Sequence, residues 1–407
     1  MEHSTRAAFL TAAYTLGLFS ALGAYAQAPA RFIQKDFCIS FWVDPPANED
    51  MDTQYRRIAD AHFNVVMGGF GARTPEQIAR QIELCAKYGL KLLVRPGGQP
   101  VDQTPDHPVV LGYLLKDEPT AAEFPALAAQ VKEFRKHRPG KLAYINLFPS
   151  TYATPAQWGV PTYDEHVRRF VDEVGVDVLS FDHYPAMRPD LDARDGYCEN
   201  LDTVRKHALR ANIPFWNFFN IMPFGPHFDP TEAQVAWQIY TSLAYGAKGV
   251  MYFCYWTPQG GEFPKGGAII AVDGRPTRHY DQARRINARI SKLGPTLMKL
   301  TSTAVHRIKP GEKAAEILKG SPIRSLTDGD YLVGVFTHQD GRRAVMLNNY
   351  RFAYTAWPTV KFRGDTAAIR EVDQETGQEI PLRDDSPAMD GLQLSLDAGE
   401  GRLFLLP

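Results

Sequence analysis

Two adjacent carboxylates, Asp117 and Glu118, follow the apolar run VVLGYLL (109–115) and precede Pro119. A third carboxylate, Asp182, closes the apolar run VDVLSFD (176–182). Hydrolysis of a glycosidic bond needs one carboxylic acid that protonates the leaving oxygen and a second group that stabilises or attacks the anomeric carbon. A carboxylate after a strand is also a common helix N-cap. The pattern therefore singles out Glu118, with Asp117 and Asp182, for acid–base chemistry.

Other polar and aromatic residues lie at or near the ends of apolar runs, where they could bind a substrate. They are Asp44, Arg95, His183, Tyr184, Trp216, Asn217 and Trp256. Some have an alternative role: Asp44 could cap a helix, Arg95 could form an internal salt bridge, His183 could be a hydrogen-bonded rim residue, and Trp256 could pack in the core. Aromatic side chains make up 12% of the chain and also offer flat surfaces for sugar rings.

Eight short apolar runs must position these residues. They span 37–43, 63–69, 90–96, 109–115, 141–148, 176–182, 213–219 and 248–256. Amphipathic stretches such as 74–89 and 124–140 separate most of them, which predicts a parallel sheet covered by helices. Eight such units favour a (β/α)8 TIM barrel over residues 31–298, with its active site at the carboxyl ends of the strands. An open doubly wound sheet is the alternative, although no GxGxxG follows the first run.

The pattern changes after about residue 299. Alternating runs at 330–338, 343–350 and 401–407 are separated by Asp-Gly turn signals at 328–329, 340–341 and 390–391. Short strands with frequent turns predict an antiparallel β-sandwich over 299–407.

Composition limits the ligands. The 407 residues carry 45 Lys and Arg against 46 Asp and Glu, and this balance argues against a nucleic-acid partner. The four cysteines are too far apart for a CxxC zinc site, and no His, Asp and Glu cluster has ligand spacing. We therefore expect neither a metal nor a cofactor, while a disulfide stays open.

The first 26 residues have the pattern of a secretory signal peptide. Arg6 precedes an apolar stretch from Ala7 to about Gly23, and Ala24-Tyr25-Ala26 matches a cleavage site. An uncleaved membrane anchor is the alternative, but the apolar run is short for a span. We expect a periplasmic or secreted protein with no membrane association after cleavage. Nothing in the residue pattern indicates an oligomeric state.

The motif LLKDEP resembles the Asn-Glu-Pro-like motif that (β/α)8 glycoside hydrolases of clan A carry after strand four. This resemblance implies that Glu118 is the general acid/base and that Trp256, after strand eight, is a sugar platform. The tail DAGEGRLFLLP looks like the accessory β-sandwich of such enzymes. An oligo- or polysaccharide would then be the substrate.

Two departures from clan A stand out. Strand seven reads IPFWNFFNIMPFG and has no carboxylate until Asp229, whereas clan A enzymes place a nucleophilic Glu there. Asp117 also replaces the usual Asn. An adjacent Asp-Glu pair resembles the β-hexosaminidases of families 20 and 123, in which the 2-acetamido oxygen of the substrate attacks. That resemblance implies that Asp117 orients the acetamido group, and Tyr184 is a candidate to bind its oxygen.

Other interpretations remain. Asp182 could serve as the second carboxylate of a retaining or inverting enzyme, and Glu262 in the loop after strand eight could move into the site. The missing strand-seven carboxylate also fits a carbohydrate-binding pseudoenzyme. A barrel lyase or aldolase would need a Lys at a strand end, and no convincing one is present.

We predict that the mature chain begins near Gln27, because the Ala24-Tyr25-Ala26 pattern places the cleavage after Ala26. N-terminal sequencing of the protein recovered from outside the cytoplasm tests this. A soluble protein that still starts at Met1 would contradict it.

Overall fold

A computed structural model describes residues 1, 30–47, 50–151, 153–188, 191–261, 263 and 265–407. Apart from Met1, the expected signal peptide over 1–26 lies outside these residues, and so does Glu262. No helix in the described ranges is long and apolar enough to cross a membrane.

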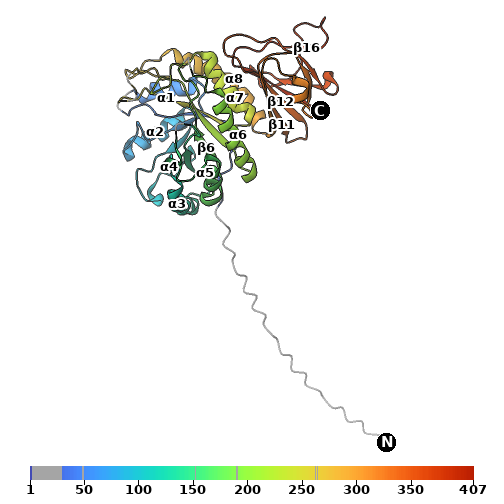
Figure 1. Ribbon diagram of the computed structural model, residues 1–407. Coiled ribbons are helices and arrows are strands. Elements are labelled where there is room, and N and C mark those ends of the chain that lie inside the picture. Colours follow the sequence, from blue (N-terminus) through green and yellow to red (C-terminus); the bar gives the residue numbers. More distant parts are fainter. Residues whose placement is uncertain (2–29, 48–49, 152, 189–190, 262, 264) are drawn as a thin grey trace.

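The first part of the chain is an eight-stranded parallel barrel (Figure 1). Its strands are β1 (Cys38–Phe41), β2 (Val65–Met67), β3 (Lys91–Val94), β4 (Val110–Asp117), β5 (Leu142–Leu147), β6 (Leu179–Asp182), β7 (Phe215–Asn220) and β8 (Gly249–Phe253). They pair in the order β1-β8-β7-β6-β5-β4-β3-β2, and the Asn64 N–H donates to the Ile39 carbonyl between β1 and β2. The predicted barrel is confirmed. Strand β4 runs two residues further than expected, so Asp117 belongs to the strand.

Helices cover the outside of the barrel. They are α1 (Met51–Asp60), α2 (Pro75–Lys87), α3 (Phe124–His137), α4 (Pro155–Trp158), α5 (Tyr163–Arg169), α6 (Arg194–Ala211), α7 (Glu232–Tyr245) and α8 (Arg278–Leu297). Shorter turns are η1 (Val101–Gln103), η2 (Ala121–Glu123) and the π-turn η3 (Phe170–Val174). The start of α2 shows why the sequence folds this way: Thr74 and Gln77 form a capping box, and Pro75 occupies the first turn.

The second part is the predicted antiparallel β-sandwich, which is also confirmed. One sheet contains β9 (Leu300–Ile308), β11 (Tyr331–His338), β12 (Arg343–Asn349), β14 (Arg370–Val372), β15 (Glu379–Pro381) and β17 (Gly401–Leu406). The other contains β10 (Ile323–Leu326), β13 (Thr359–Phe362) and β16 (Leu392–Gln393), while α9 (Ala314–Ile317) and η4 (Thr366–Ala368) connect strands. The sandwich packs on α7, where Asn348 Nδ2 donates to the Tyr240 carbonyl at 2.7 Å.

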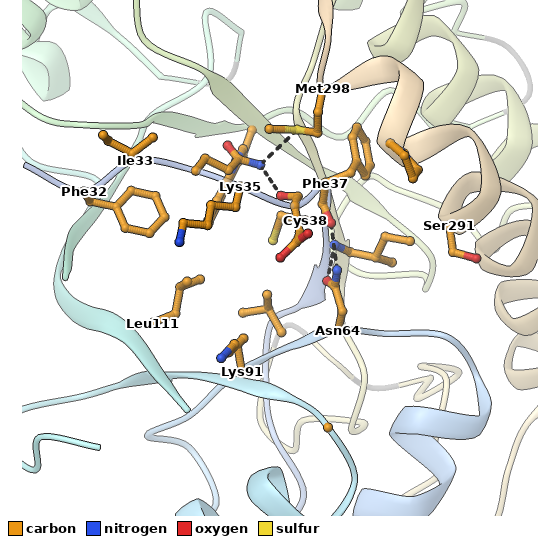
Figure 2. A pocket seen from close by; sticks show the side chains of 18 of the residues that line it. Phe32, Ile33, Lys35, Phe37, Cys38, Asn64, Lys91, Leu111, Ser291 and Met298 are labelled. Carbon is orange, nitrogen blue, oxygen red and sulfur yellow. Dashed lines mark hydrogen bonds between the residues drawn. The ribbon is translucent and has the colours of Figure 1, made fainter. Parts of the chain in front are cut away.

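The amino end of the barrel is closed by the segment that precedes β1. Gln34 bridges this end, because its Nε2 donates to the Lys248 carbonyl and its Oε1 accepts from Trp216 Nε1 at 2.9 Å. Beside it lies a cavity of about 940 Å³, around which Figure 2 shows Phe32, Lys35 and Lys91. Trp216 therefore lies at the end opposite to the expected active site.

Candidate active site

A cavity of about 820 Å³ opens at the carboxyl ends of the barrel strands. Its polar lining includes Asp117, Glu118, Asn146, Asp182 and Tyr184. Aromatic side chains form much of the remaining wall: Trp42, Phe70, Phe218, Phe224, Phe253, Trp256 and Phe263. The cavity thus brings together the three predicted catalytic carboxylates with two of the predicted binding residues, Tyr184 and Trp256.

The end of β4 presents Asp117 and Glu118 through an irregular backbone. The pairing of β4 with β5 shifts by one residue between Leu114 and Lys116, and Asp117 then lies opposite Asn146. Glu118 adopts a left-handed backbone with φ of 48°, and its N–H donates to the Asn146 carbonyl at 2.8 Å. Such a conformation costs about 1–3 kcal/mol for a residue with a side chain and is typical of functional sites.

Asn146 connects two of the carboxylates. Its Nδ2 donates to Asp182 Oδ1 at 2.9 Å and to Asp117 Oδ1 at 3.3 Å. Asn146 and Asp182 are buried, whereas solvent in the cavity reaches Asp117. The amide therefore fixes the two carboxylates side by side.

Burial raises the pKa of all three acids, and repulsion from neighbouring carboxylates adds to the rise at Glu118 and Asp182. Burial, and then the charge of Asp117, raise the pKa of Glu118 to about 7. Burial, and then Glu118 and Asp117, raise the pKa of Asp182 well above its usual range. The pKa of Asp117 is also raised by desolvation, because protein surrounds it on the sides away from the cavity, but Asn146, Arg95 and Lys116 act against this rise. Simultaneous ionisation of all three groups is therefore disfavoured.

Tyr184 and Trp256 lie in the cavity wall in different ways. The Tyr184 ring packs against Phe253 at 5.0 Å and Phe224 at 5.3 Å between ring centroids. Trp256 is 5% exposed, lines the cavity and also packs into the main hydrophobic core. Trp256 thus packs in the core, as the core-packing interpretation expects, and it also reaches the cavity wall, where the sugar-platform prediction places it.

Asp44 does not line this cavity. Its carboxylate accepts from the N–H groups of Phe70 at 2.9 Å and Gly71 at 2.8 Å, and from Gln81 Nε2 at 2.8 Å. It does not cap α1 either, because Asp50 is the N-cap of that helix. Asp44 instead holds the loop after β2, and through it the Phe70 wall of the cavity.

Three further residues that we expected in the subsite lie elsewhere, and a fourth, Arg95, lies at its rim. On β7, successive side chains alternate, so Asn217 points outward and donates to Tyr197 Oη at 2.6 Å, while Trp216 points inward at the amino end. His183 is buried, with Nδ1 2.8 Å from Asn200 Oδ1 and Nε2 3.2 Å from Thr151 Oγ1. Arg95 is exposed at the rim, with its guanidinium carbon 5.7 Å from the centroid of the Phe70 ring.

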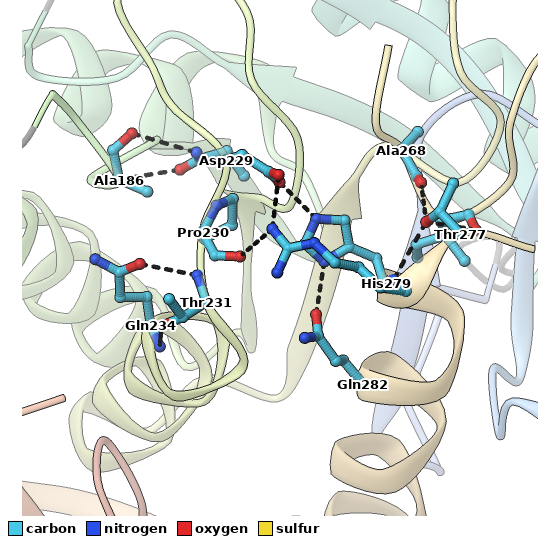
Figure 3. A network of polar contacts seen from close by, with 12 residues as sticks. Ala186, Asp229, Pro230, Thr231, Gln234, Ala268, Thr277, His279 and Gln282 are labelled. Atoms are coloured by element: carbon cyan, nitrogen blue, oxygen red, sulfur yellow. Dashed lines mark hydrogen bonds and ion pairs between the residues drawn. The ribbon is translucent and has the colours of Figure 1, made fainter. Parts of the chain in front are cut away.

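The first carboxylate after β7 is used for structure. Asp229 contacts His279 Nε2 at 2.7 Å and an Arg278 guanidinium nitrogen at 2.6 Å, and His279 Nδ1 lies 2.7 Å from Gln282 Oε1 (Figure 3). These contacts tie the loop before α7 to the start of α8. In the part of the chain that the structure describes, β7 thus adds no carboxylate to the cavity lining. Within the same residues, no group of three or more His, Cys, Asp or Glu side chains could hold a metal ion.

Asn146 is the functional residue that the sequence interpretation missed. It lies inside the apolar run 141–148, and only the register of β5 against β4 and β6 shows that it meets Asp117 and Asp182. The aromatic residues Trp42, Phe218 and Phe253 were also missed, although each belongs to a strand or a strand end.

Comparison with known proteins finds likeness in structure only. No protein-family model matches the sequence, and no curated protein matches it. A family 39 glycoside hydrolase from Bacteroides cellulosilyticus WH2 is 16% identical with a TM-score of 0.50, over 91% of this chain and 81% of that one. A family 42 β-galactosidase from G. stearothermophilus, solved as a catalytic mutant, is 9% identical with a TM-score of 0.62, over 91% and 98%. A β-galactosidase from Bacillus circulans sp. alkalophilus is 9% identical with a TM-score of 0.60, over 91% and 99%.

These likenesses show the fold. The expected resemblance to (β/α)8 glycoside hydrolases is confirmed at that level, and the barrel and the following sandwich are both covered.

We predict that Asp44→Ala lowers the free energy of unfolding by about 2–3 kcal/mol, because it leaves the part-buried N–H donors of Phe70 and Gly71 without their acceptor. Asp44→Asn retains one acceptor oxygen and should cost less. Urea unfolding of both variants measures this. If Asp44→Ala keeps wild-type stability but binds sugar more weakly, the result contradicts the structural role and supports a role of Asp44 in ligand recognition.

Proposed function

We propose that this protein is an exported glycoside hydrolase that cleaves O-glycosidic bonds of an oligo- or polysaccharide with Glu118 as general acid/base. The observation that carries the proposal is the Glu118 carboxyl, whose pKa is raised to about 7 inside an aromatic-walled cavity at the carboxyl end of the barrel. A carboxylic acid with such a pKa is protonated often enough to donate to the leaving oxygen and can then act as a base. The likeness to barrel glycoside hydrolases supports this assignment through the fold.

Asp117 is the ionised partner in this proposal. Solvent reaches its carboxylate, Asn146 donates to it, and the positive charges of Arg95 and Lys116 counteract the effect of burial on its pKa. An ionised Asp117 raises the pKa of the neighbouring Glu118 and so keeps the proton on the acid.

The same arrangement favours a substrate-assisted mechanism. Asp117 would accept the N–H of a 2-acetamido group and orient its oxygen toward the anomeric carbon, while Tyr184 would bind that oxygen. An attacking oxygen held in place gains the advantage of an intramolecular reaction. The β7 residues that line the cavity, among those described, include Phe218 and no carboxylate, which is consistent with a nucleophile supplied by the substrate.

Asp182 is the alternative candidate for the group that acts on the anomeric carbon. It lines the cavity, and it accepts a hydrogen bond from the same Asn146 amide as Asp117. In a retaining or inverting enzyme it would be the nucleophile or the base. Its raised pKa counts against that role in the free protein, since a protonated carboxyl neither attacks nor accepts a proton. A carbohydrate-binding pseudoenzyme remains the alternative if no glycoside is cleaved.

We predict that Glu118→Gln lowers kcat on substrates with poor leaving groups by about 10²–10⁴-fold, because the proton donor is lost. In the wild type, kcat should fall as the pH rises through about 7, since the protonated acid disappears. This limb should be absent in Glu118→Gln. Glu165→Gln, on α5 and outside the cavity lining, is a matched control that should behave as wild type. Activity of Glu118→Gln within about threefold of wild type would contradict the assignment.

We also predict that N-acetylhexosaminides are hydrolysed and that the matching hexosides, with only a hydroxyl at carbon two, are not. A thiazoline analogue of the cyclised intermediate should inhibit strongly. Steady-state assays of paired aryl glycosides test this. Equal or faster cleavage of the hexosides would exclude substrate assistance, and Asp182→Asn would then be the decisive variant.

A further inference from the structure

A chain of hydrogen bonds runs from the barrel interior to the carboxylates. Tyr144 Oη lies 2.7 Å from Ser180 Oγ, and Ser180 Oγ lies 3.0 Å from Asn146 Oδ1. Tyr144 and Asn146 are two residues apart on β5, as are Ser180 and Asp182 on β6, so all four side chains face the interior. All four are at most 5% exposed.

The chemistry of the groups gives this chain a direction. A serine hydroxyl has a single hydrogen, and Asn146 Oδ1 can only accept it. Tyr144 must then donate to Ser180 Oγ. Because Ser180 donates to the Asn146 amide oxygen, both N–H groups of the amide are directed toward the carboxyl groups. One donates to Asp117 and the other to Asp182.

A reversed amide would have the opposite effect. It would place Oδ1 against the carboxylate oxygen of Asp117, where two acceptors repel each other. The Asn146 orientation therefore decides whether the neighbouring carboxylate is stabilised as an anion. Ser180, two residues before Asp182 and not among the residues that line the cavity, controls that orientation.

We propose that Ser180 and Tyr144 are positioning residues, which fix the Asn146 amide so that it donates to Asp117 and Asp182. Their consequence for catalysis rests on the function proposed above, in which Asp117 works as the anion beside Glu118. Neither residue needs to touch the substrate.

The test compares Ser180→Ala with a matched change at Ser40. Ser40 on β1 is also fully buried, and its hydroxyl has no hydrogen-bond partner among the described residues. Carbon-13 NMR of protein labelled at the aspartate carboxyl carbons follows the titration of Asp117, with the signal assigned by Asp117→Asn. Thermal unfolding and circular dichroism establish that each variant is folded.

In Ser180→Ala, the titration of Asp117 should move to higher pH by about one unit, because a hydrogen bond to its anion is weakened. The low-pH limb of the kcat profile should move in the same direction. At pH values below that limb kcat should fall about tenfold, while KM should stay within about twofold. Tyr144→Phe should show a smaller shift of the same sign. Ser40→Ala should show none.

Two results separate this inference from the proposed function. A shift in Ser180→Ala in a protein that cleaves no glycoside supports the positioning role and contradicts the function. Wild-type titration and pH profile in Ser180→Ala and Tyr144→Phe, in an active enzyme, overturn the positioning role and leave the function standing. If Ser180→Ala does not fold, Tyr144→Phe decides by the same two measurements.

Discussion

The crowding of Asp117, Glu118 and Asp182 in one cavity is the constraint on which the rest of the site depends. Each carboxyl loses hydration on burial, and neighbouring anions further disfavour ionisation of Glu118 and Asp182. Asp117 is the most exposed of the three, accepts from Asn146 and lies near the positive charges of Arg95 and Lys116, so in the proposed function it is the group that carries the charge. Repulsion between the carboxylates destabilises the ionised cluster. The same repulsion raises the pKa of Glu118, so that it can hold a proton near neutral pH.

The barrel positions this cluster with local irregularities. The shifted pairing in β4 places Asp117 opposite Asn146, and the left-handed backbone of Glu118 turns the chain directly after it. The Glu118 N–H bond to the Asn146 carbonyl holds this turn. Asn146 therefore contributes both its backbone and its side chain to the site, and strain at Glu118 is maintained by the surrounding strands.

The layout of the barrel could be predicted because its strands are continuous apolar runs, and residues after such runs meet at one end. On that basis Glu118, Asp182, Tyr184 and Trp256 were expected near one another, as they are. The expectation failed at Asn217 and Trp216, because an apolar run does not show which alternate side chains face inward. Asn146 was missed because the register between strands is not visible in one sequence, and the donors around Asp44 come from a distant loop.

The central claim is that Glu118 holds a proton beside an ionised Asp117. Carbon-13 NMR of the free protein, labelled at the glutamate side-chain carboxyls and assigned with Glu118→Gln, measures this without a substrate. We expect Glu118 to titrate near pH 7, and its titration to move toward the ordinary range in Asp117→Asn, because the neighbouring charge is removed. Titration of Glu118 near its ordinary pKa of about 4.3 in the wild type would contradict the claim.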